Sequence, residues 1–240
     1  MNVIYYSQPD NAFSDLYITV RKKENRFYSE EEIKNLPNIQ KEDPNYAEWQ
    51  LRKKSSNRFI SYLKGKNKPL KIMEIGCGNG WFSHLMSTIE KTQVTGLDVT
   101  VPELEQAARI FEKENLNFVY ADIFEETQLN EKRFDIIVFN SSIQYFKDLL
   151  ELFKIVKELL SENGEIHIID SPFYEGSEIE EAKKRTQNYY LNLGFPEMSK
   201  NYFHHRIDSL GKHKIMYNPF SFLNHFRKDS PFYWVLIKSD

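Results

Sequence analysis

A glycine-rich segment in the first half of the chain constrains the fold most strongly. Residues 72–80 read Ile-Met-Glu-Ile-Gly-Cys-Gly-Asn-Gly, so an apolar run with Glu74 near its end leads into three alternating glycines. Glycine is favoured where the backbone takes a positive φ, or where a ligand approaches more closely than a Cβ atom allows. We therefore expect a buried strand, a tight turn and then a helix, with a ligand site above the turn.

Short apolar runs alternate with amphipathic segments from residue 70 onward. Helices are expected where apolar residues recur three and four positions apart, as at Phe82, Leu85 and Met86. This alternation, with strands that are apolar on both faces, is typical of a parallel sheet covered by helices on each side. The expected parallel strands cover residues 70–75, 93–98, 117–121, 134–139 and 165–170.

The end of the chain has a different pattern. A helix is expected around 178–193, closed by Gly194. Strand-like runs at 213–217 and 231–238 could form an antiparallel pair at the sheet edge.

The start of the chain, residues 1 to about 45, reads as a polar and irregular lead-in, followed by a helix over about 45–63. We therefore divide the chain at residue 65. Residues 1–65 would form a lead-in that could cap a site, and residues 66–240 would form the core domain.

Two classes of nucleotide cofactor use a glycine turn of this kind. Dinucleotide sites favour the spacing G-x-G-x-x-G, with a pyrophosphate at the helix N-terminus. Here Trp81 occupies the position of the third glycine, and Glu74 would lie unfavourably close to a pyrophosphate. The same carboxylate suits a ligand that carries a sulfonium and an ammonium group.

The next two expected strands also end in acidic residues. Asp98 can accept hydrogen bonds from both hydroxyls of a ribose. Asp122 could accept a hydrogen bond from an adenine amino group while Ile123 packs on the ring. Thr100 and Glu103 have the spacing of a capping box, which would begin the helix after Asp98.

Composition excludes several other classes of protein. The chain has 240 residues, a formal net charge of −3 and one cysteine, Cys77, so it offers no internal disulfide and no cysteine-rich metal site. No apolar run reaches the roughly 18 residues that a membrane span needs. We expect a cytoplasmic protein without a metal, a nucleic-acid partner or a membrane partner, and leave its oligomeric state open.

These motifs together resemble the class I S-adenosylmethionine-dependent methyltransferases. EIGCGNG is similar to their first motif, GLDVT to their ribose-binding strand end, YADIF to their adenine contact and FDIIVFNSSIQYF to their fourth-strand motif. The resemblance spans roughly residues 70–175, and the flanks extend it toward an uncharacterised bacterial subgroup. It implies a Rossmann-like, doubly wound sheet of seven strands, mostly parallel with the last strand antiparallel, and S-adenosyl-L-methionine as cofactor.

The resemblance also implies a role for individual cofactor-binding residues. The methionine part of the cofactor would lie against Glu74 and the glycine turn, and the adenosine part at the next two strand ends. Asn140 would offer its backbone carbonyl to the cofactor's amino group. The implied cofactor-binding residues are Glu74, Gly76, Gly78, Asp98, Val99, Asp122, Ile123 and Asn140.

Methyl transfer is an in-line displacement that needs a base only if the acceptor must lose a proton. Gln144 and Tyr145, after the fourth strand, could contact the acceptor or cap the following helix. The pattern that amino-directed nucleic-acid methyltransferases carry at this place is missing, which disfavours a nucleobase acceptor. Asp170 ends the fifth strand and is either an acceptor-facing base or a loop carboxylate.

A segment rich in histidine and basic residues, 200–228, suggests an anionic or phenolic acceptor. His204 or His205 would then act as a base, although the alternative is a solvated basic edge. Methyl transfer to a small-molecule acceptor is the favoured function. The alternatives are a silent S-adenosylmethionine-binding protein, a protein methyltransferase and a nicotinamide-dependent oxidoreductase, the last disfavoured by the glycine spacing.

Overall fold

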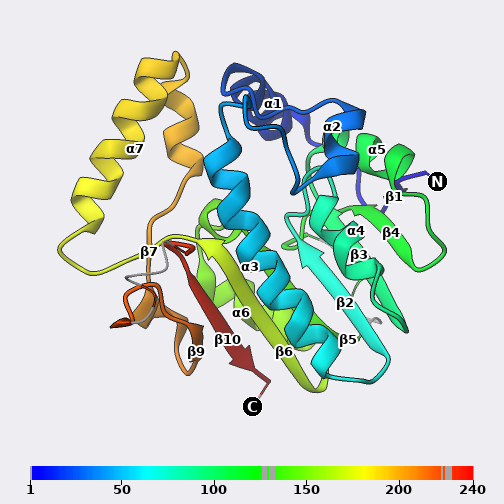
Figure 1. The fold of residues 1–240 in the computed structure, drawn as a ribbon. Helices are drawn as coiled ribbons and strands as arrows, with labels where there is room; N and C mark the ends of the chain where they lie inside the picture. The colour runs from blue at the N-terminus through cyan, green and yellow to red at the C-terminus, as the bar shows by residue number, and fades with distance from the viewer. Residues whose placement is uncertain (1, 126–128, 130–132, 223, 225–228, 240) are drawn as a thin grey trace.

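An eight-stranded sheet lies at the centre of the computed structural model, which describes residues 2–125, 129, 133–222, 224 and 229–239 (Figure 1). The strand order is β1-β4-β3-β2-β5-β6-β10-β9. The first six strands in this order run parallel, and β10 is antiparallel to both of its neighbours. The strands are β1 (Ile4–Tyr5), β2 (Leu70–Ile75), β3 (Thr92–Asp98), β4 (Leu116–Tyr120), β5 (Phe134–Asn140), β6 (Leu160–Ser171), β9 (Lys214–Tyr217) and β10 (Tyr233–Lys238).

The mixed sheet and the antiparallel pair at its end confirm the expected fold class, but the strand count of seven was wrong. The eighth strand, β1, comes from the lead-in and pairs with β4 through Ile4 and Tyr5. The Tyr5 ring stacks on the Tyr120 ring at 5.7 Å between centroids. A strand of two residues is too short to produce an alternating pattern in the sequence.

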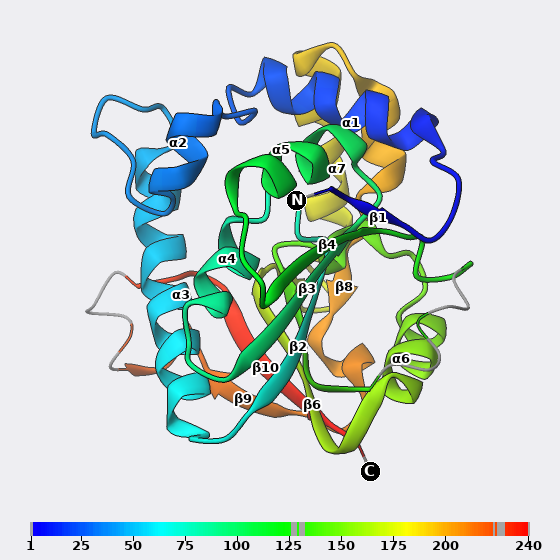
Figure 2. The same ribbon diagram turned by 90° about the vertical axis from the view of Figure 1, so that its right-hand side faces the viewer.

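Helices cover both faces of the sheet, as Figure 2 shows from the side. Buried residues of β2 alternate between the faces: Ile72 packs in the core cluster that includes Phe59 and Phe82, and Met73 packs in the cluster that includes Leu152. Both faces of the sheet are therefore shielded from solvent, as expected for parallel strands. One face is covered by α3 (Tyr46–Gly65), α4 (Trp81–Ser87) and α5 (Val101–Ile110), and the other by α6 (Leu149–Glu158).

The lead-in is more regular than the sequence indicated. It contains α1 (Asn11–Lys23) and α2 (Glu30–Asn35). Asp10 caps α1 by accepting from the N–H of Ala12, and Ser29 and Glu32 form a capping box at α2. Local capping thus forms helices from a segment whose polar composition suggested irregular chain.

The remaining elements lie toward the carboxyl ends of the parallel strands or beside β10 (Figure 1). The expected helix near 178–193 is present and ends at Gly194, which has φ +93°. Of the described residues, no helix has both the length and the apolar character to cross a membrane. His225, Arg227 and Lys228 of the basic segment lie outside the described residues. The elements are η1 (Ile143–Tyr145), β7 (Phe173–Tyr174), α7 (Ile179–Leu193), η2 (Pro196–Asn201), β8 (His205–Arg206) and η3 (Ile207–Leu210).

Candidate active site

The glycine turn after β2 adopts the conformation that its sequence predicted. Gly76, Gly78 and Gly80 all have positive φ. A Cβ atom on Gly76 would lie 2.4 Å from the Cβ of Ser142. The N–H groups of Gly76 and Cys77 donate to the carbonyl of Leu97, which fixes the turn against the end of β3. Only glycine fits at Gly76, because the turn passes directly beside the end of β5.

A cavity of about 360 Å³ lies over the carboxyl ends of β3 and β4. It brings together the residues that the sequence assigned to the adenosine part of the cofactor, with Tyr145 from η1. From α1, Tyr17 lies on its wall. The predicted site residues on this cavity are Gly76, Gly78, Asp98, Val99, Asp122, Ile123 and Tyr145.

A second cavity, of about 100 Å³, lies on the other side of the glycine turn. Glu74 and Asn140 line it, and it shares Gly76, Gly78 and Tyr17 with the larger cavity. The two cavities thus meet at the glycine turn. All eight predicted cofactor-binding residues line one or both of these neighbouring cavities.

The carboxyl group of Glu74 is buried and partnered. Ser83 on α4 donates to it at 2.5 Å. Burial raises the pKa of Glu74 to about 8, and hydrogen bonds from Ser83 and Asn140 oppose this shift. The Oδ1 atom of Asn140 is buried and has no hydrogen-bond partner among the described residues. This wall of the smaller cavity therefore presents oxygen acceptors.

Asp98 organises the turn through its two carboxylate oxygens. Oδ2 accepts from the N–H of Gly78 at 2.7 Å, and Oδ1 accepts from the N–H of Thr100 at 2.8 Å. Burial raises the pKa of Asp98, and these hydrogen bonds oppose the shift. The expected capping box is wrong, because the Thr100 side chain makes no cap and Glu103 turns into the smaller cavity instead.

The two predicted acceptor-contacting residues differ in position. Tyr145 lines the larger cavity, and its hydroxyl accepts from Arg21 at 3.2 Å. Gln144 is buried and lines neither cavity; its amide donates to the carbonyl of Ser141 at 2.6 Å. Tyr145 thus lies on a cavity wall and Gln144 makes a structural contact, and contact of either residue with the acceptor stays a prediction.

None of the three predicted bases lines either cavity, although the carbonyl of Asp170 accepts at 2.6 Å from the hydroxyl of Ser141, which lines both. Asp170 is buried with φ +49°, and Ser55 donates to it at 2.5 Å. His204 lies 2.9 Å from the hydroxyl of Thr186 on α7, and His205 belongs to β8. Burial lowers the pKa of both histidines. Their roles as bases stay a prediction, and neither cavity wall includes any of the three side chains.

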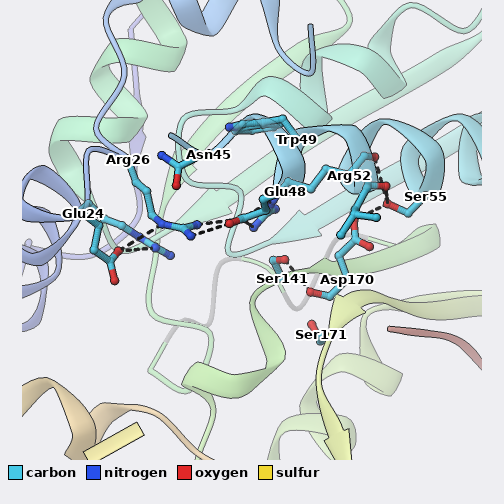
Figure 3. A network of polar contacts seen from close by, with 12 residues as sticks. Glu24, Arg26, Asn45, Glu48, Trp49, Arg52, Ser55, Ser141, Asp170 and Ser171 are labelled. Carbon is cyan, nitrogen blue, oxygen red and sulfur yellow. Dashed lines mark hydrogen bonds and ion pairs between the residues drawn. The ribbon is translucent and has the colours of Figure 1, made fainter. Parts of the chain in front are cut away.

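Sequence reasoning missed a network of arginine and glutamate side chains that links the loop after α1 to α3 (Figure 3). Arg26 contacts Glu48 at 2.6 Å, and Arg52 contacts the same carboxylate at 2.9 Å. Glu24 contacts Arg21 at 2.9 Å and extends the network onto α1. All three arginines line the smaller cavity. The spacing of Glu48 and Arg52, one helical turn apart, is the signal that the sequence offered.

This network predicts a specific response to acid. Burial alone would raise the pKa of Glu48, but the charge of Arg52 and the hydrogen bond and charge of Arg26 outweigh it and lower the pKa to about 2. Because the pKa is lower in the folded state, the carboxylate stabilises the fold above about pH 4.5, and this contribution is lost as the pH falls toward 2.

A Glu48→Gln variant is therefore expected to lose about 1–3 kcal/mol of unfolding free energy at pH 7. Urea unfolding at a series of pH values measures the difference between wild type and variant. The difference should shrink between pH 4.5 and 2, and a difference that stays constant over this range would contradict the ion-pair account.

A doubly wound sheet with a cavity at the carboxyl ends of its strands is the arrangement in which α/β proteins bind nucleotide cofactors. Residues 66–219 match the family model described as "Methyltransferase domain". The chain belongs to this family and is a class I S-adenosylmethionine-dependent methyltransferase. A nicotinamide-dependent oxidoreductase is thereby excluded.

Relatives of known name agree with this family. The chain is 31% identical over 124 residues to malonyl-[acyl-carrier protein] O-methyltransferase 1 of Ilyobacter polytropus, which covers 51% of this chain and 45% of that protein. It is 32% identical over 101 residues to malonyl-[acyl-carrier protein] O-methyltransferase of Acetivibrio thermocellus, covering 41% and 35%. The chain thus spans less than half the length of these relatives.

Solved structures show the same fold. The plantazolicin methyltransferase BpumL, in complex with S-adenosylhomocysteine, is 18% identical, with a TM-score of 0.55 over 94% of this chain and 100% of that one. Magnesium protoporphyrin IX methyltransferase from Synechocystis, with the same compound bound, is 12% identical, with a TM-score of 0.57 over 94% and 96%. At these identities the likeness concerns the fold alone.

The site itself fits S-adenosylmethionine. Asn140 Oδ1 and Glu103 Oε2 are buried acceptors without a partner among the described residues, and they suit a ligand that carries ammonium and hydroxyl donors. Over the described residues, no cluster of three or more His, Cys, Asp or Glu is placed to hold a metal ion.

Proposed function

We propose that this methyltransferase transfers the methyl group to a carboxylate oxygen of a small-molecule acceptor. The observation that carries the proposal is the arginine-rich wall of the smaller cavity. Arg21, Arg26 and Arg52 line it, and the acidic partners that the structure gives them are Glu24 and Glu48. Glu74 and Glu103 also line this cavity, but burial raises the pKa of each to about 8, so near pH 7 they are mainly neutral. The three guanidinium groups then outnumber the two ionised carboxylates, which favours an anionic ligand group.

A carboxylate acceptor also agrees with the positions of the predicted bases. A carboxylic acid is already ionised near pH 7, so its oxygen attacks without a base. His204, His205 and Asp170 line neither cavity, in keeping with a reaction that needs no proton removal. Two relatives are O-methyltransferases of malonyl-[acyl-carrier protein], and a malonyl group ends in a carboxylate.

The remaining tasks of the protein are alignment and exclusion of water. Bound S-adenosylmethionine supplies a methyl group that is already activated on its sulfonium. We assign Glu74, Asn140 and the glycine turn to the methionine part of the cofactor, and Asp98, Asp122 and Ile123 to the adenosine part. Residues 1–65 would act as a cap on the core, since Tyr17 of α1 lines both cavities.

The test uses cofactor labelled in its methyl group and a metabolite extract enriched in organic acids. A methyl ester releases volatile labelled methanol in mild alkali, whereas methyl ethers and methylamines keep the label. We expect product whose label is released by alkali. Label that resists alkali would instead indicate a phenolic or amine acceptor, and cofactor binding without any product would indicate a silent binding protein.

Arginine variants connect the activity to the cavity. An Arg21→Met variant should lose at least about a hundredfold in kcat/KM, because a charge-assisted contact to the acceptor contributes about 1.5–3 kcal/mol and alignment is lost with it. The control is Arg109→Met, since Arg109 is exposed on α5 and pairs with Glu30. Equal turnover in both variants would contradict the assignment of the arginine wall to the acceptor.

Histidine variants test the competing assignment of a base. His204→Ala and His205→Ala are expected to keep kcat within about threefold of wild type. A hundredfold loss in kcat with unchanged melting temperature, in either variant, would show that the histidine removes a proton from the methyl acceptor. That result would contradict a carboxylate as the methyl acceptor.

A further inference from the structure

Asp170, near the end of β6, is a buried carboxyl group that lines neither cavity. Burying such a group costs free energy unless protein donors replace the lost water. Ser55 of α3 donates to its Oδ2 at 2.5 Å, and Ser230 donates to its Oδ1 at 3.3 Å. The Ser55 hydroxyl has one proton, and this contact is shorter than its contacts with the carbonyls of its own helix. The carboxyl group thus joins α3 to the segment before β10.

A β-bulge determines the direction in which Asp170 points. On β6, Ile168 packs in the core cluster on the α6 face, and Ile169 packs in the cluster on the α3 face. Strict alternation would therefore point Asp170 toward α6. Instead, two residues of β6, Ile169 and Asp170, lie opposite one residue of β10, Trp234, and Asp170 has φ +49°. The bulge turns the carboxyl group toward Ser55 on α3.

The end of the neighbouring strand has a similar backbone conformation. Ser141, directly after β5, has φ +54°. Its N–H donates to the carbonyl of Ile169 at 3.0 Å, and its hydroxyl donates to the carbonyl of Asp170 at 2.6 Å. A left-handed conformation is unfavourable for a residue with a Cβ atom, and such residues cluster at functional sites. Two of them, joined by a hydrogen bond, stand at adjacent strand ends.

Both segments that Asp170 holds lead directly to the cavities. Ser141 lines the larger and the smaller cavity. Arg52 lines the smaller cavity and lies three residues before Ser55, on the same side of α3. The charge of Arg52 opposes the rise that burial causes in the pKa of Asp170, so the two groups interact electrostatically. In Figure 3, Asp170 lies between Ser55 and Ser141, below Arg52.

We propose that Asp170 is a positioning residue for methyl transfer, which fixes Arg52 and Ser141 on the acceptor side of the site. Its carboxyl group holds α3 through Ser55, so that α3 presents Arg52 to the smaller cavity in one orientation. Its carbonyl holds the Ser141 hydroxyl. The inference rests on the proposed assignment of the arginine wall to the acceptor, and not on the chemical class of the acceptor.

The cofactor side of the site is held by other contacts. The glycine turn is fixed by hydrogen bonds to Leu97 and Asp98 of β3, and none of these bonds involves α3 or β6. Loss of the contact between Ser55 and Asp170 should therefore weaken use of the acceptor and leave use of the cofactor unchanged.

The experiment measures initial rates with labelled S-adenosylmethionine over a dilution series of the organic-acid extract. Ser55→Ala removes the hydroxyl from α3 and changes no residue of either cavity wall. We expect its half-saturating extract concentration to rise at least about tenfold, and its KM for S-adenosylmethionine to stay within about twofold of wild type. Asp170→Asn keeps the shape of the side chain and tolerates a positive φ, and should show the same split.

A double-mutant cycle tests whether the two groups act through one contact. The variant that combines Ser55→Ala with Asp170→Asn should lose no more than either single variant, within about twofold. The matched control is Ser61→Ala, because Ser61 is exposed on the same helix and donates only to the carbonyl of Asn57 among the described residues. This variant should behave like wild type.

Three results would overturn the proposal. An unchanged half-saturating extract concentration in both single variants, with a lower melting temperature, would show a structural role alone. Equal losses for extract and cofactor, or additive losses in the double variant, would also contradict it. Total labelled product gives these rates, so an alkali-stable product would contradict the carboxylate acceptor and leave this inference standing. Wild type that forms no product would contradict both.

Discussion

A Gly76→Ala variant is expected to lose about 2–5 kcal/mol of unfolding free energy and measurable cofactor binding. Gly76 has φ +76°, a conformation that costs an alanine about 1–2 kcal/mol. The new Cβ would also lie 2.4 Å from the Cβ of Ser142. Ser142 cannot simply withdraw, because its hydroxyl donates to the carbonyl of Ile75 at 2.6 Å. Relieving the clash must move the turn or the end of β5.

Gly194→Ala provides the control for backbone strain without a clash. Gly194 has φ +93°, but no atom lies within 4 Å of the position of its Cβ. This variant should lose only about 1 kcal/mol and keep cofactor affinity. Urea unfolding measures both free energies. If the two variants are equally stable, the close approach of the turn to β5 is not the constraint that we describe.

Asp98→Asn is expected to weaken binding of S-adenosylhomocysteine at least about a hundredfold. The carboxylate accepts from the N–H groups of Gly78 and Thr100 with separate oxygens. An amide has one oxygen, so one of these buried N–H groups would face an NH₂ group and lose its partner. The ribose contact also loses its charge, and each 1.4 kcal/mol of lost interaction is a tenfold change in affinity.

Asp135→Asn is the matched control for Asp98→Asn. Asp135 also accepts a hydrogen bond from a backbone N–H, that of Lys71 at 2.8 Å. It lies at the amino end of β5, whereas the cavities lie at the carboxyl ends of the strands. Its replacement should leave affinity unchanged in the same calorimetric titration. An Asp98→Asn variant that binds within threefold of wild type would contradict the role of Asp98.

The sheet and the cofactor side of the site could be predicted because their signals are local in sequence. Each parallel strand is a short apolar run, and Glu74, Asp98 and Asp122 stand at or just beyond the ends of such runs. Parallel topology then brings these ends to one edge of the sheet. The backbone turn at Gly76 and Gly78 is likewise set by residue type.

The acceptor side could not be predicted, because it depends on contacts between distant segments. Arg21 and Arg26 reach the cavity only because α1 and the loop after it pack over the strand ends, beside Arg52 of α3. Glu103 shows a different limit. The spacing of Thr100 and Glu103 fits a capping box, in which Glu103 would accept from the N–H of Thr100. In the structure Asp98 accepts from that N–H instead, and Glu103 lines the smaller cavity. Sequence spacing does not reveal which of two competing acceptors prevails.

The most direct test of the whole account is a crystal structure of the protein with S-adenosylhomocysteine at saturating concentration. We expect one ligand that spans the two cavities across the glycine turn, with its ribose at Asp98 and its adenine beside Ile123. Clear density for the compound anywhere else, with both cavities filled only by water, would contradict it.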